Sequence, residues 1–305
     1  MSDELLERLR PASFAIAYRM LGSVSEAEDV VQEALLRFHG AIQDGEQIES
    51  PRAFVATVTT RLAIDELRSA RARRERYTGE WLPEPLLTDG EDDPARHAEM
   101  ADSLSMAMLV LLESLSAEQR AVLLLRDVFD YRYDEIAPIV GKSEDNVRQL
   151  ASRARKHVAE GGPRFTTSRE QRDELARKFF AAAQEGDLGE LEALLAHDVV
   201  LTGDGGGNVP ALARSLHGRS RVAHTLLNWI KLGTRIPGAS MRPVEVNGAP
   251  GTLLIDGDER LIAVWALEIG HGQIQSVNSI VNPEKLAHLR PLADLTTLLR
   301  LSGRG

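Results

Sequence analysis

The first 77 residues carry the apolar period of packed α-helices. Between residues 27 and 38 apolar side chains recur at steps of three and four, and Ser25 followed by Glu28 predicts a capping box at the start of that helix. A second helix is predicted over residues 51–76, because a serine suits the N-cap before it and a proline its first position. We therefore expect an all-helical domain over residues 1–77.

Residues 78–94 interrupt this period. Their prolines, glycines and acids are typical of a linker. From residue 95 to 162 the helical period returns. Its last two helices, over 133–140 and 143–158, are separated by a turn at Gly141, which is the spacing of a helix-turn-helix. The predicted buried seam of this motif comprises Ile136, Val140, Val147, Leu150 and Ala154.

The remaining residues, 168–305, change from helical to strand periodicity. Two amphipathic helices are predicted around Phe179 and Leu191, and turn signals such as NGAPG and DGDE separate the strands that follow. The predicted strands are 199–202, 241–246, 251–255, 260–268 and 274–281. This order indicates an α+β domain.

Composition narrows the class of protein. The chain has 305 residues, which is long for one domain, and no apolar run is long enough for a membrane span, so we expect a soluble multidomain protein without membrane contact. The charged start MSDELLERLRP lacks the apolar core of a secretory signal, which favours the cytoplasm. The absence of cysteine excludes disulfides, thiol redox sensing and cysteine-containing zinc sites. We predict no cofactor and no metal site.

The charges are segregated along the chain. The net charge is −10, which argues against a protein that coats nucleic acid with its whole surface. Yet residues 68–76 hold five arginines and one acid, whereas residues 80–102 hold eight acids and one arginine. This pattern indicates a local DNA contact beside an acidic linker.

Several sequence blocks resemble one protein family. DVVQEALLRF (29–38) and PRAFVATVTTRLAIDELRSARARRE (51–75) resemble region 2 of extracytoplasmic-function (ECF) sigma factors. LSAEQRAVLLLRDVFDYRYDEIAPIVGKSEDNVRQLASRARKHV (115–158) resembles their region 4. FFAAAQEGDLGELEALLAHDVVLTGDGGG (179–207) and NPEKL (282–286) resemble SnoaL-like domains. The chain is thus identified as a member of the ECF subgroup with a fused C-terminal SnoaL-like domain.

The resemblance implies a multidomain architecture and a function. Two all-α sigma domains, the second with the helix-turn-helix, are followed by an α+β SnoaL-like cone domain. The implied domains are region 2 (1–77), an acidic linker with the motif WLPEP (78–94), region 4 (95–162) and the SnoaL-like regulatory domain (168–305). Such a protein is an alternative RNA polymerase sigma factor that directs promoter-specific transcription initiation under the control of its own C-terminal domain. It would be a monomer when free.

One helix face is the expected site for the polymerase core. In the family this helix docks on the coiled coil of the β′ subunit, and the core partners are β′ and β. The corresponding residues are Asp29, Gln32, Glu33, Leu36 and Arg37. A solvated helix face is the alternative for any charged stripe, but a large apolar residue in its middle and the resemblance favour binding.

Two further sets are expected to contact promoter DNA. For the minus 10 element the resemblance indicates Arg52, Arg61, Asp65, Arg68, Arg71, Arg73 and Arg74. For the minus 35 element it indicates the outward face of the recognition helix, Asn146, Arg148, Gln149, Ser152, Arg153, Arg155 and Lys156. Arginine and glutamine can read guanine and adenine edges, while arginine and lysine also bind phosphates. Alternatively, Arg61 and Asp65 pair on the helix surface at the i, i+4 spacing.

Three short motifs are expected to act in regulation. They are WLPEP (Trp81, Leu82, Pro83, Glu84, Pro85), DGGG (Asp204, Gly205, Gly206, Gly207) and NPEKL (Asn282, Pro283, Glu284, Lys285, Leu286). By its residues alone DGGG reads as a flexible loop. The resemblance favours packing of the tail on the linker and on the first helical block, with Trp81 as the anchor because a large amphipathic ring in a polar linker should bury itself.

Two other function classes remain open. A SnoaL-like fold can host an enzyme, for which the candidate residues would be Asp198, Asp204, His224 and His271. We predict no catalytic residues and expect that any pocket there holds a small regulatory ligand instead. A repressor with one helix-turn-helix is the third class, but it leaves residues 29–38 and 51–75 unexplained.

Overall fold

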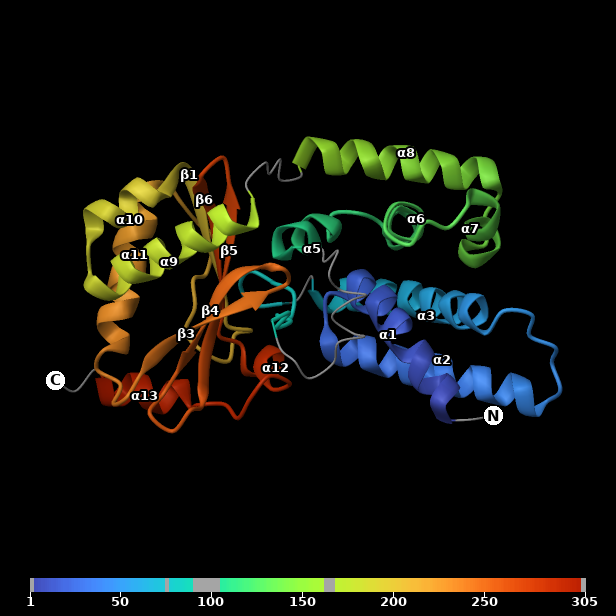
Figure 1. The fold of residues 1–305 in the computed structure, drawn as a ribbon, viewed down its shortest axis with the longest axis horizontal. Coiled ribbons are helices and arrows are strands. Elements are labelled where there is room, and N and C mark those ends of the chain that lie inside the picture. Colours follow the sequence, from blue (N-terminus) through green and yellow to red (C-terminus); the bar gives the residue numbers. More distant parts are fainter. Residues whose placement is uncertain (1–2, 75–76, 90–104, 162–167, 303–305) are drawn as a thin grey trace. The chain divides into compact units, whose positions relative to one another are not determined.

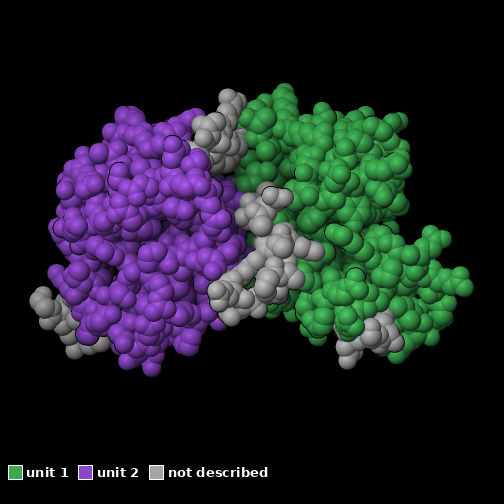
Figure 2. All heavy atoms as spheres, in the orientation of Figure 1, with its two compact units in different colours: residues 1–76, 91–104, 108–162 green, residues 77–90, 105–107, 163–305 purple. Residues whose placement is uncertain are grey.

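The computed structural model describes residues 3–74, 77–89, 105–161 and 168–302, without the side chains of residues 3, 70–74, 161 and 299–302. The chain divides into two compact units (Figure 2). Unit 1 comprises residues 1–76, 91–104 and 108–162, and unit 2 comprises residues 77–90, 105–107 and 163–305. The described part of the predicted linker, residues 78–89, is therefore grouped with the C-terminal domain.

Unit 1 begins with three packed helices, α1 (Asp3–Leu21), α2 (Val24–Gln43) and α3 (Pro51–Arg74) (Figure 1). The apolar stripe predicted for α2 is buried and faces α1 and α3. The helix starts earlier than predicted, because Ser23 has an extended backbone and its hydroxyl accepts a hydrogen bond from Glu26 N at 3.2 Å. The capping box expected at Ser25 is therefore wrong.

The described residues of the second helical block form four helices, α5 (Met106–Leu112), α6 (Ala117–Asp127), α7 (Tyr133–Val140) and α8 (Glu144–Gly161). Gly141 ends α7 with a φ of 67°, a left-handed conformation that glycine adopts without strain. The helix-turn-helix is thus found with the predicted turn, and all five seam residues are buried or half-buried. Its core cluster comprises Val122, Leu125, Ile136, Ile139, Val147 and Ala151.

Unit 2 is an α+β domain, so the expected fold class is confirmed. Its sheet has the strand order β2-β1-β6-β5-β4-β3, with β1 and β6 parallel and the other pairs antiparallel. The strands are β1 (Leu195–Asp204), β2 (Leu216–His217), β3 (Ser240–Val246), β4 (Ala249–Ile255), β5 (Leu261–Gly270) and β6 (Gln273–Ile280). The helices are α9 (Arg169–Glu185), α10 (Leu188–Leu194), α11 (Arg219–Gly233), α12 (Pro283–Leu286) and α13 (Leu295–Ser302). No helix among the described residues is long and apolar enough to cross a membrane.

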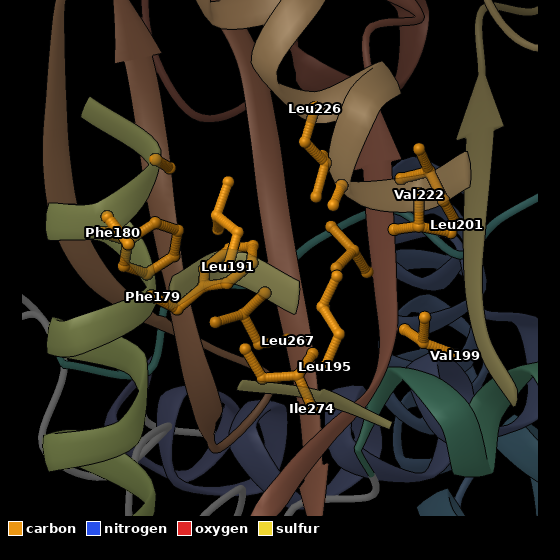
Figure 3. Close-up of a cluster of buried hydrophobic side chains, with 14 of the residues drawn as sticks. Phe179, Phe180, Leu191, Leu195, Val199, Leu201, Val222, Leu226, Leu267 and Ile274 are labelled. Carbon is orange, nitrogen blue, oxygen red and sulfur yellow. The ribbon is translucent and has the colours of Figure 1, made fainter. Parts of the chain in front are cut away.

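Helices α9, α10 and α11 cover one face of the sheet. Phe179 and Phe180 of α9 lie edge to face, with ring centroids 5.4 Å apart, and pack with Leu191, Leu226 and Leu267 in a continuous apolar cluster (Figure 3). Burial of this cluster supplies the hydrophobic stabilisation that holds the helices on the sheet.

The opposite face of the sheet is covered mainly by segments from elsewhere in the chain. Leu82 of the predicted linker and Met106, near the start of the predicted region 4, pack in one cluster with Val264, Ile280 and Leu286. Leu82 is 2% exposed and Met106 is 0% exposed. Unit 2 therefore completes its second core with residues of the predicted linker and with the first described residues of the predicted region 4.

Candidate functional site

The face expected to bind the polymerase core lies on α2. Asp29, Gln32, Leu36 and Arg37 are exposed and Glu33 is partly exposed. Leu36 is 59% exposed, which is unusual for a large apolar side chain in a packed helical unit. Glu33 Oε1 accepts a hydrogen bond from Arg37 Nε at 2.7 Å, so the two charges form one surface ion pair beside it.

Four of the residues expected to contact the minus 10 element, Arg52, Arg61, Asp65 and Arg68, have described side chains on α3, and these four are exposed. Arg61 and Arg68 hold the second helical block. Arg61 donates hydrogen bonds to the carbonyls of Pro138 at 2.8 Å and Ile139 at 3.2 Å, near the end of α7. Carbonyls of the last helical turn lack intrahelical donors, so an arginine satisfies them well. The side chains of Arg71, Arg73 and Arg74 lie outside the described residues.

Arg68 is the second α3 arginine that joins the two blocks of unit 1. It donates to Glu118 Oε1 of α6 at 2.7 Å and to Asp65 Oδ1 at 3.1 Å. The hydrogen bond from Arg68 lowers the pKa of the Glu118 carboxyl. Asp65 thus pairs with Arg68 rather than with Arg61, whose guanidinium binds the carbonyls of α7. The exposed Arg52 lies at the start of the same helix.

The outward face of α8 carries the residues expected to read the minus 35 element. Asn146, Arg148, Gln149, Ser152, Arg153, Arg155 and Lys156 are all exposed. Arg148 pairs with Glu144, and Arg155 donates to Asp127 of α6 and to Tyr133 of α7. Arg155 therefore joins α8 to α6 and α7. Gln149 and Arg153 are exposed on the outward face of α8.

A buried ion pair joins two of the three regulatory motifs in unit 2. Asp204 ends β1 and is 0% exposed, and its Oδ2 lies 2.6 Å from Nζ of Lys285 in α12. Both side chains also hold the linker, because Leu82 N donates to Asp204 Oδ2 at 2.8 Å and Lys285 Nζ donates to the Leu82 carbonyl. We call Asp204, Lys285 and the linker residues Tyr77, Trp81 and Leu82 the clasp.

Two aromatic rings complete the clasp. Lys285 Nζ lies 4.2 Å from the centre of the Trp81 ring and 4.8 Å from that of Tyr77, so both rings face a cation. The Tyr77 hydroxyl donates to Asp204 Oδ1 at 2.5 Å and accepts from Asn282 Nδ2 at 2.8 Å. Burial raises the pKa of Tyr77, and the acceptor Asp204 raises it further. Trp81 is only partly buried, and Leu82 is the deeper anchor.

The glycines of DGGG allow the close approach of their neighbours. A Cβ on Gly206, whose φ is 64°, would lie 2.4 Å from Nδ2 of Asn282, and one on Gly207 would lie 2.9 Å from Cβ of Thr78. DGGG is thus a packed junction with the linker and with NPEKL.

After Leu82 the linker continues along the edge of the sheet. Residues 82–86 are buried, and Leu87 bridges Val246 of β3 in an antiparallel manner. Asn247 N donates to the Leu86 carbonyl at 2.8 Å, and Leu86 N donates to Asn247 Oδ1 at 3.1 Å. The linker therefore acts as a short additional strand beside the edge strand β3.

Residues 105–107, which were predicted as part of region 4, also belong to unit 2. Met106 is buried in unit 2, and Ala107 N donates to Glu268 Oε1 at 2.9 Å. The first amides of a helix lack intrahelical acceptors, so the carboxylate caps α5. Glu268 is 4% exposed, and burial raises its pKa.

Unit 2 also holds a cavity of about 620 Å³. Its walls include Trp229 and Gly233 of α11, Leu254 of β4 and Trp265 of β5. None of the four residues proposed for catalysis, Asp198, Asp204, His224 and His271, lines it.

Comparison with known proteins shows the family. The family models Sigma-70 region 2 and Sigma-70, region 4 match residues 5–73 and 105–158. The ECF RNA polymerase sigma factor SigJ of Mycobacterium tuberculosis (strain ATCC 25618 / H37Rv) is 37% identical over 289 residues, which are 92% of this chain and 91% of that protein. The chain belongs to the ECF family of sigma factors. It therefore directs transcription initiation by binding the RNA polymerase core and promoter DNA, and it is not an enzyme.

Two further comparisons extend over nearly the whole sigma factor. The "Probable ECF RNA polymerase sigma factor SigI" of the same species and strain is 32% identical over 284 residues, covering 90% of this chain and 91% of that protein. The crystal structure of M. tuberculosis SigJ matches with a TM-score of 0.76 and 33% identity, covering 96% of this chain and 100% of that chain. The likeness thus includes the C-terminal α+β domain.

The sequence reasoning missed four residues that hold the linker. Tyr77 was assigned to the first domain, while Met106, Asn247 and Glu268 were not singled out. Tyr77 follows an arginine cluster and gives no local signal of its partners. Asn247 lies in the turn signal NGAPG, and Glu268 is an acid in an otherwise apolar strand, which is the one sequence feature that could have marked it.

Proposed function

We propose that the C-terminal domain of this sigma factor controls transcription initiation by holding the linker between regions 2 and 4. The clasp is the observation that carries the proposal. Its buried charges are satisfied by linker groups, the Leu82 amide and carbonyl and the Tyr77 hydroxyl, so release of the linker leaves them without these partners. Release is therefore a discrete step with a free-energy cost.

In this proposal the described surfaces of unit 1 act once the linker is free. The α2 face around Leu36 binds the polymerase core in the cytoplasm, the α3 arginines contact the minus 10 element, and the α8 face contacts the minus 35 element. The free protein is a monomer, and a small molecule in the C-terminal domain is its input. Region 2 and region 4 are connected through the clasped linker, so a held linker restricts how far the two regions can separate.

Transcription from a cognate promoter with purified polymerase core tests the control by the clasp. Lys285→Met removes the cation that holds Leu82 and faces both rings, and we expect it to raise the yield of transcript. Lys231→Met, at an exposed position of α11, is the matched control and should leave the yield unchanged. Equal yields from the two variants, with both folded, would reject control by the clasp.

A binding assay with polymerase core tests the α2 face separately. Glu33→Lys combined with Arg37→Glu reverses both charges while keeping the ion pair possible, and we expect core binding to weaken at least tenfold, as for charges close to a binding hot spot. Glu46→Lys, exposed beyond the end of α2, is the control. Unchanged core binding by the reversed pair would contradict the assignment of this face.

A further inference from the structure

The cavity of unit 2 is lined without an ionisable side chain among its described residues. Its apolar walls include two tryptophans, Trp229 and Trp265, whose ring centroids lie 6.1 Å apart at an interplanar angle of 49°. The polar side chains at the wall are those of Gln184, Thr234, Ser240 and Ser279, all of them neutral. A charged ligand would therefore lose its hydration there without gaining a counter-charge.

We infer that this cavity is a binding site for an uncharged, largely apolar small molecule that carries one or two hydrogen-bonding groups. The volume of about 620 Å³ lies within the range of roughly 300 to 1,000 Å³ for small-molecule sites. The two tryptophans suit a flat or polycyclic apolar body, and the hydroxyl and amide groups suit its polar substituents.

The cavity and the clasp share their structural supports. Gly203 lines the cavity and the next residue, Asp204, holds the linker. Val281 also lines the cavity, and its amide donates to the Asp204 carbonyl at 2.9 Å. An occupant that presses on these two strand ends thus acts directly on the position of Asp204.

The loop after DGGG provides a second connection. Pro210, Ala211 and Leu212 line the cavity, while Ser215 N donates to Glu80 Oε1 of the linker at 3.3 Å. Gly203 allows Leu212 to pack closely, because a Cβ there would lie 3.1 Å from Leu212 N. The loop is therefore placed between the ligand and the linker, and ligand binding strengthens the hold on the linker by ordering it. This regulatory meaning rests on the proposed function, whereas the binding site does not.

A pair of fluorescent probes tests the site and the class of ligand on the full-length protein. N-Phenyl-1-naphthylamine is neutral, and 8-anilino-1-naphthalenesulfonate has a similar ring system with a negative charge. We expect saturable binding of the neutral probe at one site and at least about tenfold weaker binding of the anionic probe. Equal affinity for the two probes would overturn the assigned class.

Substitutions that fill the cavity locate the binding. Gly233 lines the cavity at the end of α11, and an added Cβ there meets nothing within 4 Å, so Gly233→Phe is accommodated without a clash at its first atom. We expect this variant and Leu254→Trp to lower the affinity for the neutral probe by about tenfold or more. Such a factor is typical of discrimination by size in an apolar pocket. Gly40→Phe is the matched control, because Gly40 is also helical with nothing within 4 Å but lies in unit 1. Unchanged affinity in both filled variants would overturn the site.

Hydrogen exchange of linker residues 77–88 tests the coupling to the clasp. With saturating neutral probe we expect slower exchange of the amides of Leu82 and Leu86 in the wild type and in Gly40→Phe, and no change in Gly233→Phe. Probe binding without slower exchange would overturn the coupling. None of these readouts involves polymerase, so they remain decisive even if transcription proves independent of the clasp.

Discussion

At the residue scale the molecule depends on a buried ion pair between Asp204 and Lys285. Taking two charges out of water is costly. The pair is tolerated because both side chains form further hydrogen bonds. Asp204 accepts from Tyr77, Leu82 and Gly206, and Lys285 donates to the Leu82 carbonyl. Most of these partners belong to the linker. The buried ion pair is therefore stable only while the linker stays in place.

Removing one charge should therefore be much worse than removing both. We expect Lys285→Met to lower the free energy of unfolding of unit 2 by about 3 to 5 kcal/mol, because it leaves the Asp204 carboxylate buried without a counter-charge. The double variant Lys285→Met with Asp204→Asn should recover a large part of this loss. Urea denaturation followed by tryptophan fluorescence measures both. A double variant that is as unstable as the sum of the two single variants would contradict this coupling.

Glu268 should make the stability of the folded protein depend on pH. Burial raises its pKa, so between the ordinary value near 4.5 and the raised value the folded state binds more protons than the unfolded state. The stability contributed by this group is present below pH 4.5 and is lost as the pH rises through the raised pKa. Ala107 N, the Ser105 side chain and the charge of Arg172 oppose the rise without cancelling it.

Glu268→Gln tests this sign, because glutamine resembles the protonated acid and keeps the acceptor for Ala107 N. We expect the thermal unfolding temperature of Glu268→Gln to equal that of the wild type near pH 4 and to exceed it increasingly toward pH 8. Differential scanning calorimetry from pH 4 to 8 measures the difference. A gap that narrows with rising pH would show that the sign is wrong.

The sequence predicted some of these residues and missed others for a physical reason. Asp204, Asn282 and Lys285 belong to motifs that the family resemblance marks. Tyr77 and Glu268 acquire their partners only through folding, since the residues they contact lie 127 and 161 positions away. A single sequence carries no local signal of such contacts.

At the element scale the linker shows the limit of local sequence patterns. Its prolines and acids indicate only a linker, and the expected packing of the tail on it came from the family resemblance. In the structure residues 82–86 are buried and Leu87 pairs with β3. So short a segment has no periodicity of its own. Its conformation is set by its contacts with the edge and the apolar face of the sheet. Helix α11 was also missed, although its apolar residues Val222, Leu226 and Leu227 follow the helical period. The helix-turn-helix, by contrast, has local signals for both helices and the turn.

Leu82→Ala should show that the linker is part of the fold of unit 2. Leu82 is 2% exposed in the apolar cluster of the second sheet face, so we expect a loss of about 2 to 5 kcal/mol in the free energy of unfolding. The amide of Asn247, which donates to Leu86, should exchange faster. Leu36→Ala, at an exposed position, should stay within about 0.5 kcal/mol of the wild type. Similar losses in the two variants would show that the linker is not packed in solution.

At the scale of the whole molecule, the two helical blocks of unit 1 are joined by two α3 arginines that are also expected to contact DNA. Arg61 is engaged by the end of α7 and Arg68 by Glu118. Either arginine must leave its partner before it can contact a promoter. We therefore expect the described form of unit 1 to be a resting form with respect to the minus 10 element.

Glu118→Ala should release Arg68 and strengthen binding of a minus 10 promoter fragment by about two- to fivefold, since a partly exposed ion pair contributes up to about 1 kcal/mol. Asp134→Ala is the matched control, because it removes the same charge from a surface pair with Arg132 that does not involve α3. Fluorescence anisotropy with the free protein measures both affinities. An equal gain in the two variants would mean that only the net charge matters.

The pairing of the linker with β3 also bears on how long an activated molecule persists. β3 is an edge strand, and residues 86–88 occupy its free side while Leu82 covers the apolar face beside it. Release of the linker, as proposed above, would make an open strand edge and an apolar surface available to chaperones, proteases and other copies of the chain. We therefore expect the working form to be the short-lived form, so that the response would end by turnover of the protein and would be renewed by synthesis.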